Sequence, residues 1–187
     1  FMSHRFELAQ SFQHAGFKVA LATRCHEYQK IIEEAGIQVF PLQHLRRGHQ
    51  SLSATLRALY ELLVIYRRYK PDVAFHVAIK PLVFGTAIAL LTRVPRVINA
   101  LGGLGHLFTP SAHASISRLK RWKQALFRQI FSRCVRILLW LTPSTLVLQN
   151  EDDQATLIAA GCLPQHPKPS KVVIILGSGI DPAHYPV

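Results

Sequence analysis

Short apolar runs alternate with helical patterns along this chain, and this alternation limits the possible folds most strongly. Strand-like runs are expected at 18–23, 37–42, 73–78, 95–101, 146–149 and 171–176. Helices are expected between them, at 4–14, 27–35, 53–70, 83–91, 115–135 and 151–160. Strands that alternate with helices form right-handed βαβ units around a parallel sheet. The sequence therefore predicts an α/β protein with a Rossmann-like parallel sheet and helices on both faces.

Capping residues mark the ends of several predicted helices. Ser3 is a favourable N-cap for the first helix, and Gly16, Gly36 and Gly161 are natural C-terminal stops. In this topology a strand precedes the first helix, and the chain begins where that strand would end. We therefore expect one domain over 1–187 that is truncated at both ends and lacks its first strand.

The basic residues are unevenly distributed. The chain has 187 residues, 49% of them apolar, with 22 Lys and Arg against 10 Asp and Glu. No carboxylate lies between Asp72 and Glu151, whereas ten cations do. This block favours an anionic partner, which is nucleic acid, a phospholipid surface or a phosphorylated substrate.

Three scattered cysteines, Cys25, Cys134 and Cys162, form no C-x-x-C pair. They suggest neither a zinc site nor a disulfide framework, and no metal site is expected. A reducing, cytosolic compartment fits this cysteine usage. No uncharged apolar run reaches the ~18 residues of a membrane span.

The stretch Asn99–Phe108 is the strongest candidate for a binding loop. It leaves an apolar strand and contains Gly102, Gly103 and Gly105, followed by His106. Glycines after a buried strand allow a sharp turn and a close approach of the backbone to a ligand. The spacing differs from the G-x-G-x-x-G dinucleotide fingerprint. A tight structural turn is the alternative interpretation.

Six stretches in this order carry a resemblance to a known family. They are Phe1-Met2-Ser3-His4-Arg5, Pro71-Asp72-Val73 running to His76, Lys80-Pro81, Asn99–Phe108, Gln149-Asn150-Glu151-Asp152-Asp153 and Gly177-Ser178-Gly179-Ile180-Asp181. The set resembles the N-terminal, acceptor-side domain of family 4 glycosyltransferases of the GT-B fold. It is most similar to the subgroup that builds bacterial capsular, exopolysaccharide or O-antigen repeat units on a polyprenyl-diphosphate lipid.

The resemblance implies an enzyme with two Rossmann-like domains that face a cleft. The N-terminal domain holds the acceptor, and the C-terminal domain holds a nucleotide-sugar, which is a co-substrate and not a cofactor. The sugar is transferred with retention of configuration, usually without a metal. Gly177, Ser178, Gly179 and Asp181 are then expected to shape the hinge and the cleft floor. Because the chain stops at Val187, we expect the donor domain to be absent and the isolated fragment to be catalytically incomplete.

The resemblance also assigns acceptor-binding candidates, and each has a simpler structural alternative. Ser3, His4 and Arg5 begin the first helix, whose N-terminus offers amide donors to a phosphate or a sugar hydroxyl; alternatively, Ser3 only caps and Arg5 is solvated. His76 lies near the end of an apolar strand, where a lone histidine is more often a hydrogen-bonded core residue. Lys80 would hold an acceptor phosphate or be an ordinary loop lysine.

The resemblance also implies roles for the residues that follow the strand at 95–101. Asn99, Gly102, Gly103 and Gly105 would form the acceptor loop. His106 would position an acceptor hydroxyl or act as its general base, although in retaining GT-B enzymes the donor phosphate usually accepts the proton. Acidic residues such as Asp152 and Asp153 at a helix start are expected to cap it.

A basic amphipathic helix is expected around Arg118–Arg136. Its cations alternate with apolar residues, a composition suited to an anionic bilayer surface. A solvated basic face on a core helix is the alternative, and the apolar run Ile137–Leu141 is either membrane-associated, a strand or a helix end. The membrane-surface candidates are Arg118, Lys120, Arg121, Trp122, Lys123 and Arg128.

We therefore expect the acceptor-binding half of a retaining glycosyltransferase, peripheral on the cytoplasmic face of the plasma membrane. It would move a sugar from a nucleotide-sugar, with UDP as the expected nucleotide, to a lipid-linked saccharide in bacterial surface polysaccharide synthesis. The alternative is a non-catalytic acceptor-binding or membrane-anchoring subunit that works with a separate donor-binding protein. Nucleic acid is not expected as a partner, because stacking aromatics and known binding modules are missing.

Overall fold

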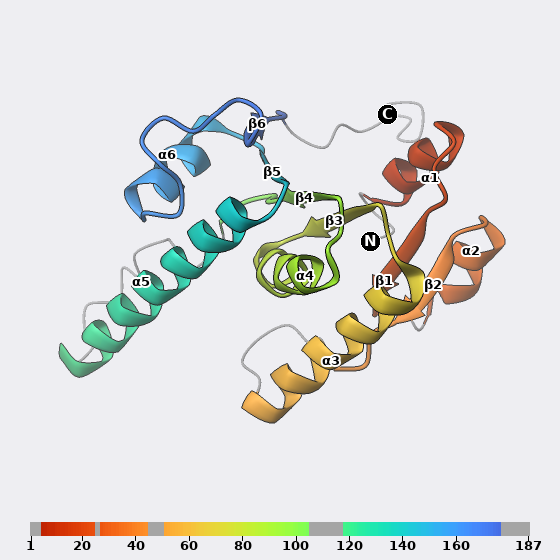
Figure 1. Cartoon of the computed structure of the whole chain (residues 1–187), viewed down its shortest axis with the longest axis horizontal. Coiled ribbons are helices and arrows are strands. Elements are labelled where there is room, and N and C mark those ends of the chain that lie inside the picture. The colour runs from red at the N-terminus through yellow and green to blue at the C-terminus, as the bar shows by residue number, and fades with distance from the viewer. Residues whose placement is uncertain (1–4, 25–26, 45–50, 105–117, 177–187) are drawn as a thin grey trace, which may run out of the picture. The chain divides into compact units, whose positions relative to one another are not determined.

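The computed structural model describes residues 5–24, 27–44, 51–104 and 118–176, shown in Figure 1. The described residues up to Ile65 form one compact unit, here unit 1, and those from Tyr66 onward form unit 2. Every strand pair in both units is parallel, which confirms the α/β prediction. The expectation of one domain over 1–187 without its first strand stays a prediction.

Unit 1 is built on two short parallel strands, β1 (Ala20–Thr23) and β2 (Gln38–Pro41). Its helices are α1 (Phe6–His14), α2 (Gln29–Glu34) and most of α3 (Leu52–Tyr69). The buried side chains Ala9, Ile32, Ile37 and Val39 form its core, with Phe6, Val19 and Leu21 packed against them.

Unit 2 contains a four-stranded parallel sheet in the order β3-β4-β5-β6. Its strands are β3 (Val73–Val77), β4 (Arg96–Ala100), β5 (Ser144–Leu148) and β6 (Val172–Ile174). Its helices are α4 (Ile79–Thr92), α5 (Arg118–Leu141) and α6 (Glu151–Ala159). In Figure 1, α4 is seen end-on against β3 and β4, and it also packs on α5.

Two buried clusters hold unit 2 together. The larger one joins Leu82 of α4, Val135 of α5, Leu146 and Leu148 of β5 and Leu157 of α6, along with Leu101 and Leu104 beyond β4. The smaller one joins Ala74 of β3, Ala89 of α4 and Val97 of β4. Both clusters include α4, whose side chains are mostly apolar and partly or fully buried. This helix therefore anchors the first two strands of the sheet.

Two helices are longer than the sequence predicts. The expected helix at 83–91 begins instead at Ile79, so Lys80 and Pro81 lie in its first turn. Proline is tolerated there because the first-turn amides have no intrahelical acceptor. The basic helix continues to Leu141, so the apolar run Ile137–Leu141 is a helix end and not a strand.

Most predicted helix caps are confirmed. Gly16, Gly36 and Gly161 follow α1, α2 and α6 with positive φ angles, as helix-terminating glycines do. Asn150 caps α6, since its side-chain oxygen accepts a 2.7 Å hydrogen bond from the Asp153 amide. The acidic first turn of that helix complements its dipole, so the capping role expected for Asp152 and Asp153 is supported. Ser3 lies outside the described residues.

Candidate functional site

His76 and Asn99 are directly opposite each other on neighbouring strands of unit 2. Each is the fourth residue of its strand, and the parallel register pairs them. Side chains alternate between the faces of a sheet, so two paired residues project to the same face. Both side chains are buried, and Asn99 is fully inaccessible. The fold therefore places two polar groups together near the carboxyl ends of β3 and β4.

A chain of hydrogen bonds connects these groups to two helices. His76 Nδ1 lies 2.8 Å from Asn99 Oδ1, and His76 Nε2 lies 2.7 Å from the Tyr66 hydroxyl of α3. The Asn99 oxygen can only accept, so Nδ1 carries the proton and Nε2 accepts from Tyr66. Thr86 of α4 also donates to Asn99 Oδ1, at 3.0 Å. These four residues, called the His76 network below, bond two strands to two helices.

Burial determines the protonation state of this network. It lowers the pKa of His76, while the hydrogen bond with Asn99 partly opposes the shift. Burial also raises the pKa of Tyr66 well above its ordinary value. Both shifts favour the neutral forms, because charged groups are poorly solvated in the protein interior. His76 is thus a neutral, hydrogen-bonded core residue, which is the simpler of the two interpretations drawn from the sequence.

Gly85 of α4 packs directly against the His76 ring. A methyl group added at Gly85 would overlap the imidazole atoms. Glycine weakens a helix interior relative to alanine, and here the close approach of helix and strand requires it. The sequence offered no signal for this contact, because Gly85 and His76 are brought together by the turn at Ala78, which has a positive φ angle.

One polar group in the network has no partner. The Asn99 amide nitrogen, Nδ2, is buried and makes no hydrogen bond within the described residues. A buried donor without an acceptor costs about 1–3 kcal/mol. The network therefore keeps one buried, unsatisfied donor near the strand ends.

After the end of β4, the chain continues through two exposed glycines, Gly102 and Gly103. The buried residues Leu101 and Leu104 flank them and belong to the core, so both sides of the turn are anchored. Gly103 has a φ of 116°, which side chains rarely allow, and a methyl group at Gly102 would lie 3.6 Å from Gln149 Nε2. The glycine turn therefore lies beside the carboxyl end of β5, as the binding-loop hypothesis requires.

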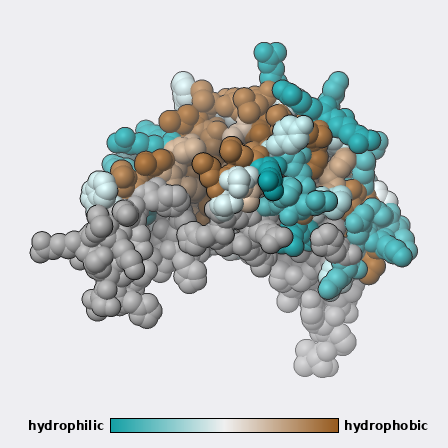
Figure 2. All heavy atoms as spheres, turned by 90° about the horizontal axis from the view of Figure 1, so that it is seen from below, coloured by the Kyte–Doolittle hydropathy of each residue, from teal (hydrophilic) through white to brown (hydrophobic). Residues whose placement is uncertain are grey.

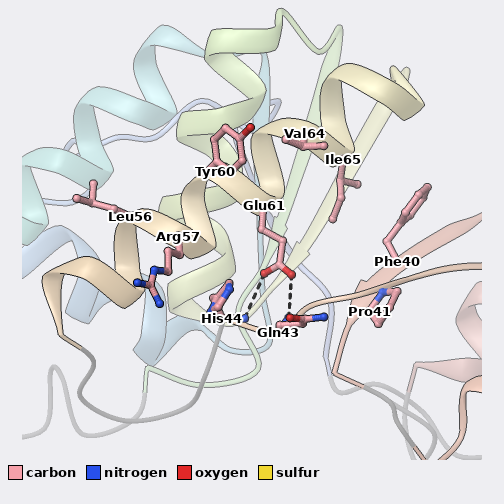
Figure 3. Close-up of a pocket in the computed structure, with 10 residues that line it drawn as sticks. All are labelled: Phe40, Pro41, Gln43, His44, Leu56, Arg57, Tyr60, Glu61, Val64 and Ile65. Carbon is pink, nitrogen blue, oxygen red and sulfur yellow. Dashed lines mark hydrogen bonds between the residues drawn. The ribbon is translucent and has the colours of Figure 1, made fainter.

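Unit 1 has its own hollow at the carboxyl end of β2. It is an open groove of about 620 Å³ between the segment after β2 and one side of α3. The Glu61 carboxylate accepts hydrogen bonds from the backbone N–H of Gln43 at 2.9 Å and from the backbone N–H of His44 at 3.2 Å, as Figure 3 shows. These bonds tie the segment to the helix. The groove is mostly apolar, lined by Phe40, Pro41, Gln43, His44, Leu56, Arg57, Tyr60, Glu61, Val64 and Ile65.

The other predicted site residues lie in different places. Arg5 is half-buried and precedes α1, and its carbonyl accepts from the Ala9 amide. Lys80 is half-buried in the first turn of α4. Trp122 and Arg128 are exposed on α5, where the backbone also carries Arg118, Lys120, Arg121 and Lys123. The residues Ser3, His4, Gly105, His106, Gly177, Ser178, Gly179 and Asp181 lie outside the described part of the chain.

Four further residues belong to the His76 network or contact it or the glycine turn: Tyr66, Gly85, Thr86 and Gln149. No pattern in the sequence marks them as site residues. Tyr66 and Thr86 are each ten residues from His76. In the sequence, Tyr66 fits an amphipathic helix and Thr86 fits an apolar helix, without any sign of a special role. Their part in the network follows from how α3 and α4 pack on the strands, and a local pattern carries no such information.

The chain belongs to the glycosyl transferase 4-like family, whose model matches residues 1–138. A comparison with curated proteins found no match. Among solved structures, the chain is similar to MurG from Acinetobacter baumannii, with 14% sequence identity and a TM-score of 0.43. The similarity covers 96% of this chain and 64% of that protein, so the chain spans less than two thirds of its length.

The contact between Gly85 and His76 predicts a specific stability pattern. Gly85→Ala should lower the free energy of unfolding by about 1–3 kcal/mol, as overpacking of a core does. In a His76→Ala background the same change should cost much less, because the imidazole is gone. Urea unfolding of the two single variants and the double variant measures this coupling. Simple additivity would contradict the described packing.

The neutral state of His76 predicts a loss of stability in acid. Its pKa is lowered in the folded protein, so the unfolded chain binds the proton first as the pH falls below about 6.5. The unfolding free energy should then decrease by up to about 1.4 kcal/mol per pH unit from this group. Urea unfolding between pH 7.5 and 5 measures it, with His76→Gln as the control that lacks the titrating ring. Parallel curves for the two proteins would contradict the prediction.

Proposed function

We propose that this chain is the acceptor-binding half of a retaining glycosyltransferase of bacterial surface polysaccharide synthesis. The family match over residues 1–138 is the observation that carries the proposal. The enzyme would move a sugar from a nucleotide-sugar, with UDP as the expected nucleotide, to a lipid-linked saccharide. The nucleotide-sugar would be bound mainly by a second, donor-binding domain.

The ends of the strands in unit 2 support acceptor binding there. Exposed backbone at Gly102 and Gly103 lets a sugar approach without steric hindrance from a side chain. His76 and Asn99 lie behind this turn and are buried, so we assign them as positioning residues and not as direct sugar ligands. His106, outside the described residues, remains the proposed group for orienting the acceptor hydroxyl.

The apolar groove of unit 1 supports an acceptor with a hydrocarbon part. Four aliphatic or aromatic side chains of α3 line it, at Leu56, Tyr60, Val64 and Ile65. Leu56 and Tyr60 are exposed. A lipid chain would cover such a surface, and the exchange of water for hydrocarbon would favour binding.

Helix α5 supports attachment to an anionic membrane surface. Exposed apolar residues follow one another at helical spacing along it, and exposed arginines lie among them. Figure 2 shows one face of the molecule, on which apolar and hydrophilic side chains both reach the surface. On this basis we propose peripheral binding to the cytoplasmic face of the membrane. None of the described helices is long and apolar enough to cross a bilayer. The residues of this surface are Trp122, Leu126, Ile130, Arg133, Arg136, Ile137 and Trp140, whereas helical periodicity places Arg128 on the opposite side of the helix.

The glycine turn provides the test of acceptor binding. Gly103→Ala should lower kcat/KM for the lipid-linked acceptor by about tenfold or more, because small displacements of reacting groups cost up to about a hundredfold. The measurement is transfer of radiolabelled sugar from UDP-sugars by the natural full-length protein. Gly161→Ala is the matched control, since Gly161 also has a positive φ and open space around it but ends α6. Equal losses in the two variants would contradict a role for the turn in the site.

The same assay separates the enzyme from the alternative subunit. An enzyme transfers sugar with its own donor domain. A non-catalytic acceptor-binding or membrane-anchoring subunit would bind the lipid-linked saccharide but show transfer only after a separate donor-binding protein is added. The variant Gly103→Ala should weaken acceptor binding in both cases.

Helix α5 provides the test of membrane binding. Changing Trp122 and Trp140 together to alanine should weaken binding to phosphatidylglycerol vesicles by more than about tenfold, since each buried aromatic contributes about 1.5–3 kcal/mol. Vesicle flotation measures this change. A double change of Leu52 and Leu91 to alanine is the control, because both residues are exposed on other helices. Similar weakening in the control would contradict a specific membrane-facing side of α5.

A further inference from the structure

Unit 2 has a hollow at the amino ends of β3 and β4, away from the glycine turn. It has a volume of about 420 Å³. Two connections form it: the turn that leads from α3 into β3 and the turn that leads from α4 into β4. We call it the amino-end pocket; it is lined by Tyr66, Arg67, Lys70, Pro71, Asp72, Thr92, Arg93, Val94 and Pro95.

The charge of this pocket is strongly unbalanced. Three exposed cations, Arg67, Lys70 and Arg93, line it together with a single carboxylate, that of Asp72. Within the described residues, the side chains of these three cations make no hydrogen bond or ion pair. Three cations around one concave space that also holds one carboxylate leave an excess of positive charge, and so a positive potential, there. The pocket is therefore electrostatically suited to an anion.

The backbone conformation around the pocket is a second, independent observation in favour of an anion site. Helices α1, α2 and α6 are each followed by a glycine with a positive φ. After α4 the same position is taken by Arg93, with a φ of 57°, and after α3 it is taken by Lys70, with a φ of 51°. Residues with side chains adopt this conformation at a cost that glycine avoids. The two helices that end at the pocket thus carry cations where α1, α2 and α6 carry glycine.

The hydrogen bonds show that Arg93 occupies the equivalent position. The Arg93 amide donates to Leu90 and the Val94 amide to Ala89, just as the Gly161 amide donates to Ile158 and the Cys162 amide to Leu157. Glycine would therefore fit in place of Arg93 with the same bonds. A cation near a helix C-terminus also complements the helix dipole, but that effect alone does not require cations from two helices to line one hollow.

We propose that the amino-end pocket binds a phosphate group. Arginine side chains present paired donors that match phosphate oxygens, and lysine adds a point charge. The phosphate would belong either to a small soluble molecule or to a lipid headgroup, which share this chemistry. The site is separate from the proposed acceptor site, so the proposal goes beyond the proposed function and does not depend on it.

The test uses the full chain and a pair of charge-matched double variants. The double variant K70G/R93G removes two pocket cations and keeps the positive φ angles with a residue that prefers them. The control R68A/R96A removes two exposed cations that lie next to the pocket in sequence but do not line it. Calorimetry measures the binding of inorganic phosphate and pyrophosphate in chloride buffer of constant ionic strength. Flotation measures binding to phosphatidylglycerol and phosphatidylcholine vesicles.

Saturable phosphate or pyrophosphate binding that weakens about tenfold or more in K70G/R93G, and less than about twofold in the control, supports a soluble phosphate ligand. The same contrast with phosphatidylglycerol vesicles alone supports a lipid headgroup. The proposal is overturned if neither probe binds or if both double variants lose binding equally, which indicates diffuse electrostatics. It is also overturned if K70G/R93G lowers only the melting temperature, which indicates a helix-dipole role.

Discussion

The hydrogen bond between His76 and Asn99 joins the two strands on which the candidate site of unit 2 is built. It connects β3 to β4, and through Tyr66 and Thr86 it extends to α3 and α4. A buried polar pair is stable only when its geometry is satisfied, so it specifies the register of the strands. The turn at Gly102 and Gly103 leaves β4 three residues after Asn99. Its position therefore depends on this register.

The uneven distribution of charge determines which kind of partner this chain can bind. With no carboxylate between Asp72 and Glu151, the cations of that segment lack acidic neighbours in sequence. Arg133 and Arg136 of α5 are exposed on a helix that also exposes apolar side chains, whereas Arg93 borders a pocket. The two surfaces would recognise different features of an anionic partner: an extended lipid surface in one case and a single phosphate in the other. Salt should weaken both, because exposed charges are screened.

Local patterns predicted most of the secondary structure. Each strand among the described residues overlaps an apolar run of the sequence, and Gly16, Gly36 and Gly161 mark three helix ends. These signals are visible in the sequence because backbone preferences act over a few residues. The errors lay where packing overrides those preferences. Lys80 and Pro81 looked like a loop, yet α4 starts at Ile79, and its buried face secures that early start. Of the candidate site, the sequence pointed to His76, Asn99 and the glycine turn, whose role stays a prediction, but not to Tyr66, Gly85 and Thr86.

The sequence by itself determined the α/β class, the parallel strands and the family, since these depend on periodicity and on short motifs that can be read along the chain. Only the tertiary structure decided what His76 does. A histidine on an apolar strand is compatible with a ligand or a core residue, and the choice depends on Asn99, Tyr66 and Gly85, which are distant in sequence. The amino-end pocket likewise exists only because two helix ends meet at one edge of the sheet. Contacts between distant residues arise from packing, and no local pattern encodes them.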